Sequence, residues 1–352
     1  MIWVDQTLSE GLRIGMDKGS ISSVTQLLQE LQVGVIDVRV SDWQGYRLTP
    51  LSMLEQKQIR GKVNGAPEEV ELAYKLGFRK IMISCALSTG EGFTHQVHAA
   101  LAAAQKRNMN IALCIENASN FSIEELEGLW RDVSIAKVKT FIYSDGDSLL
   151  NPLSTSRILA SLIERLPVVL EFHSHNGYGL ATANALGAMQ VGVKRIAAAV
   201  SGIGSQGHAA IEEVIMAQKW LLGQKTGETE GVALICSQIM LAMGLIIPKT
   251  KAIIGQDIFA HESGIHVDGV IKNPQLYEAF PPEDVGLSRK LVIGKHSGTT
   301  AIEVKFRQWN VVLSAEQAQG LLKEVRKLAI EHKKSVDDAA LWQLYQSVQV
   351  AL

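Results

Sequence analysis

The sequence predicts a (β/α)8 TIM barrel followed by a small, mostly helical C-terminal region. Apolar runs alternate with helical patterns, giving eight such units in about 220 residues, close to the ~250 typical of this barrel. The chain has 352 residues, of which 47% are hydrophobic, so it can bury a large core and still carry an appendage. We expect a catalytic barrel over residues 1–225 and a helical region over 226–352.

The expected strands are short apolar runs that begin near the first residues and recur throughout the barrel region. They cover 2–5, 33–39, 57–63, 79–84, 109–116, 139–145, 167–173 and 194–200. The run at 57–63 is the least typical, because Lys57, Gln58 and Arg60 are polar for a buried parallel strand. A doubly wound open sheet is the competing fold, but no glycine-rich phosphate loop follows the first strand.

The expected helices have apolar residues at helical spacing and lie between or after these runs. They cover 24–31, 67–76, 94–106, 123–135, 154–166, 181–191, 209–222, 315–333 and 336–348. The last two follow Ser314 and Ser335, which are typical helix-capping residues.

Charge and composition exclude several classes of function. A net charge of −2 with scattered basic residues gives no case for nucleic acid or an anionic membrane, and no apolar run reaches the ~20 residues that span a bilayer. Cys85, Cys114 and Cys236 lack the spacing of a metal site and are odd in number, which favours a reduced, cytoplasmic setting. The first residues read as a strand and not as a signal peptide.

Two histidines at the end of the seventh run, His173 and His175, are the strongest functional signal. Residues two apart on a strand point to the same face, so both imidazoles can reach one divalent cation. Such a pair alone is more often structural. However, polar residues follow the other strands too, and strand ends share one rim of a barrel. They are Thr7, Ser9 and Glu10 after the first strand, and Asp37, Ser84, Glu116 and Asp145 after later ones. Together they predict a metal and acid–base site.

Several longer motifs carry a family resemblance. The segment 173–184 reads HSHNGYGLATAN, 259–270 reads FAHESGIHVDGV, and 294–298 reads GKHSG. With the opening Asp5-Gln6-Thr7-Leu8, they resemble the homocitrate synthase and 2-isopropylmalate synthase family. In length and in its C-terminal helices the chain is most similar to the short, nitrogen-fixation-type homocitrate synthases.

The resemblance implies a metal-dependent Claisen condensation of acetyl-CoA with a 2-oxo acid, 2-oxoglutarate first among them. It places a divalent cation (Mg²⁺, Mn²⁺ or Zn²⁺) on Glu10, His173 and His175. His208 stands near a metal-proximal asparagine of the family, as a further ligand or as a structural histidine. The remaining implied roles are catalytic for Glu116, His266 and Tyr277, and substrate-binding for Thr7, Ser9, Asp37, Ser84 and Asp145. The post-barrel helices cover the partner's barrel in this family, which implies a homodimer.

The chain also departs from the family pattern. Ser9 stands where an arginine polarises the keto group, Gly177 replaces an aspartate, and Ile142 replaces an arginine. Arg13 and Arg39 are candidates to supply the missing cation. Two functions stay open: an active acyltransferase with an altered 2-oxo acid pocket, or a catalytically weakened paralogue that binds or regulates, alone or in a heteromer with an intact synthase. A lyase on the same scaffold is a weaker third.

Overall fold

The computed structural model describes residues 1–48, 51–52, 55–90, 92–262, 269 and 273–351. The chain divides into two compact units. The first consists of residues 1–228 and 234–247, and the second of residues 229–233 and 248–352. His266, which the resemblance made a catalytic candidate, lies outside the described residues.

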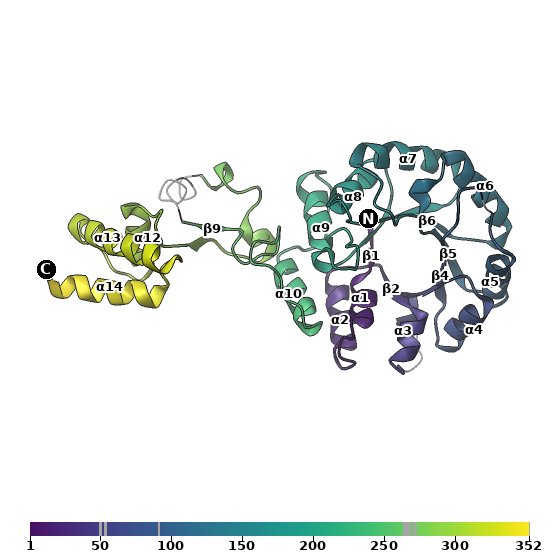
Figure 1. Cartoon of the computed structure of the whole chain (residues 1–352), viewed down its shortest axis with the longest axis horizontal. Coiled ribbons are helices and arrows are strands. Elements are labelled where there is room, and N and C mark those ends of the chain that lie inside the picture. The colour runs from purple at the N-terminus through teal and green to yellow at the C-terminus, as the bar shows by residue number, and fades with distance from the viewer. Residues whose placement is uncertain (49–50, 53–54, 91, 263–268, 270–272, 352) are drawn as a thin grey trace. The chain divides into compact units, whose positions relative to one another are not determined.

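The first unit is a closed parallel barrel, so the predicted TIM barrel is confirmed (Figure 1). Every strand pairs with the next along the chain, and the first closes the ring by pairing with the eighth. The strands are β1 (Ile2–Asp5), β2 (Val35–Arg39), β3 (Ile59–Val63), β4 (Lys80–Cys85), β5 (Asn110–Ile115), β6 (Thr140–Asp145), β7 (Val169–Ser174) and β8 (Arg195–Ala198). These bounds follow the apolar runs, because both faces of a parallel strand are buried in this fold.

The polar third strand does form, and its packing explains its composition. A Cβ placed on Gly61 would lie 2.8 Å from Val40 Cγ2 and 2.9 Å from a Phe78 ring carbon, so this face is packed tightly against the outer layer. Arg60 and Lys62 alternate with Gly61 and therefore point to the barrel interior. Arg60, one of the residues that made this strand atypical, is thus an interior residue with polar partners, whereas Lys57 lies before the strand and is exposed.

Helices surround the barrel on its outside (Figure 1). They are α1 (Thr7–Arg13), α2 (Ser20–Glu30), α3 (Val40–Gly45), α4 (Pro67–Lys75), α5 (His95–Lys106), α6 (Ile123–Val133), α7 (Pro152–Arg165), α8 (Ala181–Gln190) and α9 (Ile211–Trp220). The sequence did not indicate α1, which starts two residues after β1. The Asp5 carboxylate accepts hydrogen bonds from the backbone N–H groups of Thr7 and Leu8 and so caps this helix. Ser9 and Glu10 consequently lie on a helix and not on a strand end.

The second unit is mostly helical. It contains α12 (Thr299–Gln308), α13 (Ala315–His332), α14 (Asp338–Ala351) and the short pair β9 (Ala260–His261) and β10 (Lys290–Leu291). The aromatic ring of Phe306 is fully buried at the centre of the helical core. Ser314 caps α13 as the sequence predicted. A further helix, α10 (Val232–Ala242), lies at the boundary of the two units. Among the described residues, no helix is long and apolar enough to cross a membrane.

Candidate active site at the mouth of the barrel

A polar cavity of about 430 Å³ lies within the barrel unit, where the strands end. Its lining comes from most of the strands and from the loops that follow them, as expected for a barrel active site. The lining residues are Gln6, Ser9, Glu10, Arg39, Lys62, Met82, Ala86, Cys114, Glu116, Asn117, Ser144, Gly146, Asp147, His173, His175, Ser205, Gln206 and His208. All four predicted metal ligands and Glu116 therefore face one space.

Glu10, His175 and His208 gather on one side of this cavity. The His175 and His208 rings have centroids 5.0 Å apart, and their backbones pair in an antiparallel bridge. His208 Nε2 lies 3.9 Å from Glu10 Oε1. The Nδ1 atoms of both histidines are buried and have no hydrogen-bond partner among the described residues. Buried ring nitrogens without partners are expected where a ligand completes a site.

The protonation states of this cluster suit cation binding. Burial, together with the charges of the nearby His208 and His173, lowers the pKa of His175 to about 3, so its imidazole is neutral at pH 7. Burial alone would raise the pKa of Glu10, but the nearby His208 and the hydrogen bond from Arg13 outweigh it and bring this pKa to about 2. A neutral imidazole and an ionised carboxylate are the forms that coordinate metals.

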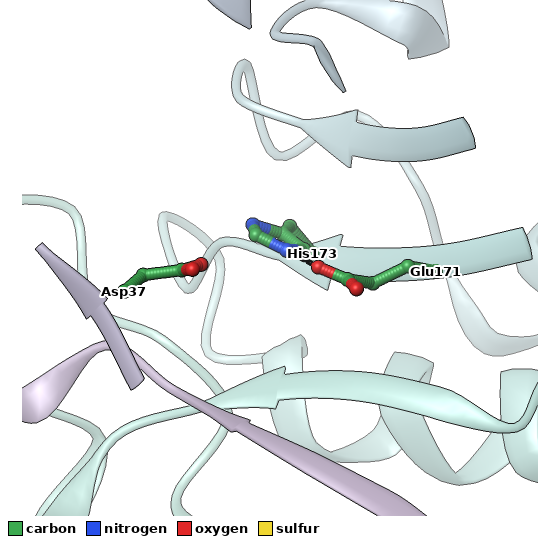
Figure 2. A group of neighbouring side chains, drawn as sticks. All are labelled: Asp37, Glu171 and His173. Carbon is green, nitrogen blue, oxygen red and sulfur yellow. Dashed lines mark hydrogen bonds and ion pairs between the residues drawn. The ribbon is translucent and has the colours of Figure 1, made fainter. Parts of the chain in front are cut away.

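A carboxylate holds the His173 ring in place through the Nε2 atom of the ring. Its Nε2 lies 2.7 Å from Glu171 Oε1, and the two side chains project from the same strand toward Asp37 (Figure 2). This contact favours the tautomer with the proton on Nε2, which leaves the Nδ1 lone pair free to bind a ligand. A carboxylate behind a ligating histidine is the arrangement that orients such ligands in metal sites.

Arg60 joins this carboxylate to a second one. Its Nε and Nη2 donate to Asp37 at 2.7 and 2.9 Å, and its Nη1 and Nη2 donate to Glu171 at 3.0 and 2.5 Å. Gln6 also donates to Asp37, at 2.7 Å, and Arg195 Nε lies 3.3 Å from Glu171. Asp37, Arg60 and Glu171 are buried. Burial raises the pKa of Glu171, but Arg60 and His173 outweigh it and keep that pKa well below its usual range.

Two sets of residues could thus hold a metal. Ligand atoms of Asp37, Glu171 and His173 lie within 4.8 Å of one another. However, the Arg60 guanidinium already bridges both carboxylates, and a cation there would have to displace it. The set formed by Glu10, His173, His175 and His208 lines the open cavity and contains the ring nitrogens without partners. The second set is therefore the better candidate to hold a metal, and the Arg60 cluster is a candidate for positioning His173.

Glu116 lies just after β5 and also lines the cavity. Its Oε1 accepts a hydrogen bond from Ser84 Oγ at 2.6 Å and lies 2.9 Å from Lys62 Nζ. Burial raises the pKa of Glu116, but Lys62 and Ser84 outweigh it, so the net pKa lies below its ordinary value. The carboxylate is therefore ionised at neutral pH and able to accept a proton.

Other predicted residues have partners elsewhere. Thr7 Oγ1 accepts from the Val200 N–H, and the Asp145 carboxylate accepts from the N–H groups of Leu149 and Leu150. Like Asp37, they are fully buried and do not line the cavity, whereas Ser9 does. Tyr277 belongs to the second unit, where its side chain is partly exposed. The substrate-binding and catalytic roles given to these residues stay predictions.

Sequence reasoning missed three residues that shape the site. Arg60 and Glu171 form the buried network, and Lys62 lines the cavity. Of the two arginines that the sequence offered as the missing cation, Arg39 lines the cavity and Arg13 is not among the lining residues. One signal was present: a charged residue inside an otherwise apolar parallel strand needs a buried partner. The pattern of β3 therefore pointed to an interior ion pair, although it could not identify Glu171, which is 111 residues away.

Comparison with known proteins identifies the family. Residues 1–230 match the profile of the HMGL-like family, and residues 253–333 match that of the homocitrate synthase post-HMGL domain-like family. The chain belongs to the HMGL-like family. Within it, the resemblance to homocitrate and 2-isopropylmalate synthases, which are condensing acyltransferases, is confirmed.

Individual relatives of this HMGL-like protein are synthases of the same two kinds. It is 32% identical to a 2-isopropylmalate synthase 2 of Caldanaerobacter subterraneus, over 99% of this chain and 95% of that protein. It is 39% identical to homocitrate synthase 1 of a Nostoc species, over 58% of this chain but only 55% of that protein. Among solved structures, an HMG-CoA lyase of Bacillus subtilis shares the fold, with a TM-score of 0.55, 16% identity, and coverage of 70% of this chain and 95% of that one.

We predict that Arg60→Met lowers the free energy of unfolding at pH 7 by about 3–5 kcal/mol, because it leaves the buried Asp37 without its counter-charge and leaves Glu171 with only the longer contact to Arg195. Denaturant titration measures this. The control is Arg131→Met, since the Arg131 side chain is 71% exposed and its removal should change stability little. Equal effects of the two substitutions would contradict the assigned role of Arg60.

We predict a pH-dependent stability contribution from His175. The unfolded chain binds a proton near pH 6.5 and the folded chain only near pH 3, so stability is lost as pH falls between these values. In the presence of chelator, the unfolding free energy should drop by up to ~1.4 kcal/mol per pH unit more in the wild type than in His175→Gln. Denaturation between pH 7 and pH 4.5 measures the two slopes, and parallel curves would show that the ring is not buried in its neutral form.

Proposed function

We propose that the protein is a metal-dependent acyltransferase that condenses acetyl-CoA with a 2-oxo acid, as in homocitrate synthases. The observation that carries this proposal is the cavity itself. It brings an ionised carboxylate and three imidazoles (Glu10, His173, His175 and His208) together with an ionised Glu116. These are the donor set of a divalent cation and a candidate proton acceptor in one space.

The donor set fits a divalent cation. Three imidazole nitrogens and one carboxylate suit Zn²⁺ or Mn²⁺ better than Mg²⁺, which prefers oxygen ligands. When bound, the cation would supply Lewis-acid polarisation of the 2-oxo group. Glu171 would keep His173 oriented for this role through the contact at Nε2.

Glu116 supports the proton-transfer step. Condensation needs a base to take a proton from the acetyl methyl group; the resulting carbanion attacks the carbonyl carbon of the 2-oxo acid, and water then cleaves the thioester to release CoA. Glu116 is ionised and hydrogen-bonded to Ser84, which fixes its carboxylate. We assign His266 and Tyr277 to the same chemistry on the resemblance alone, contributed by the partner in a homodimer.

The lining favours a dicarboxylic substrate. Arg39 and Lys62 add positive charge to a mostly polar wall, to which Met82, Ala86 and Cys114 contribute small apolar patches. 2-Oxoglutarate, with two carboxylates, suits this lining better than the branched 2-oxo acid that would give 2-isopropylmalate. The relative that matches nearly the full chain is nevertheless named a 2-isopropylmalate synthase, so that substrate is the second candidate.

We predict that the Zn²⁺- or Mn²⁺-loaded protein releases CoA when it is incubated with acetyl-CoA and 2-oxoglutarate. A thiol reagent measures the release, and 2-oxo-3-methylbutanoate and pyruvate complete the panel of acceptors. Release should stop on chelation, and Glu116→Gln should lower the rate by about 10²–10⁴. The matched control is Glu124→Gln, because the Glu124 side chain is 70% exposed on the outer helix α6.

The two open functions give different outcomes in this assay. No release with any 2-oxo acid, from folded and metal-loaded protein, would contradict the synthase. Calorimetric binding of metal and 2-oxo acid without release would instead support the weakened paralogue.

A further inference from the structure

Lys62 occupies a special place among the charged residues of the cavity. It lies on β3 two residues after Arg60, so the strand directs both side chains into the barrel, Arg60 into the buried network and Lys62 into the cavity. Its side chain is 24% exposed, and its Nζ lies 2.9 Å from Glu116 Oε1. A strand position fixes the ammonium group more firmly than a loop would.

Lys62 connects the candidate base to the rest of the cavity. Its ammonium group pairs directly with Glu116, and its side chain lines the same cavity as His173 and His175. A fixed positive charge in this space can stabilise the negative charge on an oxygen of a bound 2-oxo acid.

The other arginines near this point are engaged or exposed. Arg13 donates to Glu10 at 2.7 Å, so it neutralises that carboxylate. Arg39 lines the cavity but is exposed at its rim. Ser9, which also lines the cavity, contributes a neutral hydroxyl. Apart from histidines, Arg39 and Lys62 are the cationic residues in the described lining, and Lys62 is the less exposed of the two.

We propose that Lys62 is the substrate-binding cation of this site and that it exchanges partners. In the free protein its ammonium group holds Glu116. When a 2-oxo acid enters, the ammonium donates to the carboxylate or keto oxygen of the substrate. Glu116 then loses part of its positive neighbour and becomes a stronger base at the moment when a proton must be taken. No covalent bond to Lys62 is formed. This inference rests on the proposed function and extends it to the residue that replaces the missing arginine charge.

The test uses full-length, metal-loaded protein with Lys62→Met and Lys62→Arg, and Lys75→Met as the control. Lys75 is exposed near the end of α4.

Calorimetry measures 2-oxoglutarate binding, and the CoA-release assay gives kcat and KM across pH. We expect Lys62→Met to weaken binding at least tenfold and to lower kcat/KM by about 10²–10³, with partial recovery in Lys62→Arg and no change in Lys75→Met. The acid limb of the kcat/KM profile should move to higher pH in Lys62→Met, because Glu116 loses the charge that lowers its pKa.

The outcomes separate this inference from the function on which it rests. A wild type that binds none of the 2-oxo acids of the panel and releases no CoA with any of them would contradict both. An active wild type with Lys62→Met unchanged in binding, rate and pH profile would overturn the Lys62 role alone. If Lys62→Met does not fold, Lys62→Arg decides: binding that is retained in full or in part, with an unmoved acid limb, supports an exchangeable cation, and abolished binding from folded Lys62→Arg overturns it.

Discussion

The buried guanidinium of Arg60 is the constraint on which the site depends. It places one positive charge between the carboxylates of Asp37 and Glu171 and so ties β3 to strands β2 and β7 inside the barrel. A buried carboxylate without a partner would be strongly destabilising, so all three side chains must be present together. The network fixes Glu171, and Glu171 fixes the ring of His173 at the cavity. The geometry of the mouth is therefore set by ion pairing beneath it.

The cavity beyond this buried network is lined by several charged and metal-ligating side chains. The neutral imidazole of His175 and the ionised Glu10 line the same cavity as the pair formed by Glu116 and Lys62. In the proposed account, Lys62 on the third strand supplies the positive charge that Ser9 on α1 does not. The proposal would explain why the candidate metal ligands resemble the family pattern while Ser9 departs from it.

The sequence predicted the barrel well, because parallel strands buried on both faces are short apolar runs with regular spacing. It also predicted the histidine pair, since i and i+2 on a strand must share a face. It did not indicate α1, because that helix starts on capping bonds from Asp5 and not on an apolar pattern. It could not reveal the contact of Arg60 with Glu171, because pairing across 111 residues depends on closure of the barrel. Tyr277 lies in the second unit, and its catalytic role rests on the resemblance alone.

Anomalous diffraction from crystals grown with Zn²⁺ and 2-oxoglutarate is the most direct measurement of the central claim. It should show one cation at the barrel mouth, coordinated by Glu10, His173 Nδ1 and His175, with Arg60 still bridging its two carboxylates and the substrate within hydrogen-bond distance of Lys62. A cation bound instead between Asp37 and Glu171, with Arg60 displaced, would contradict it.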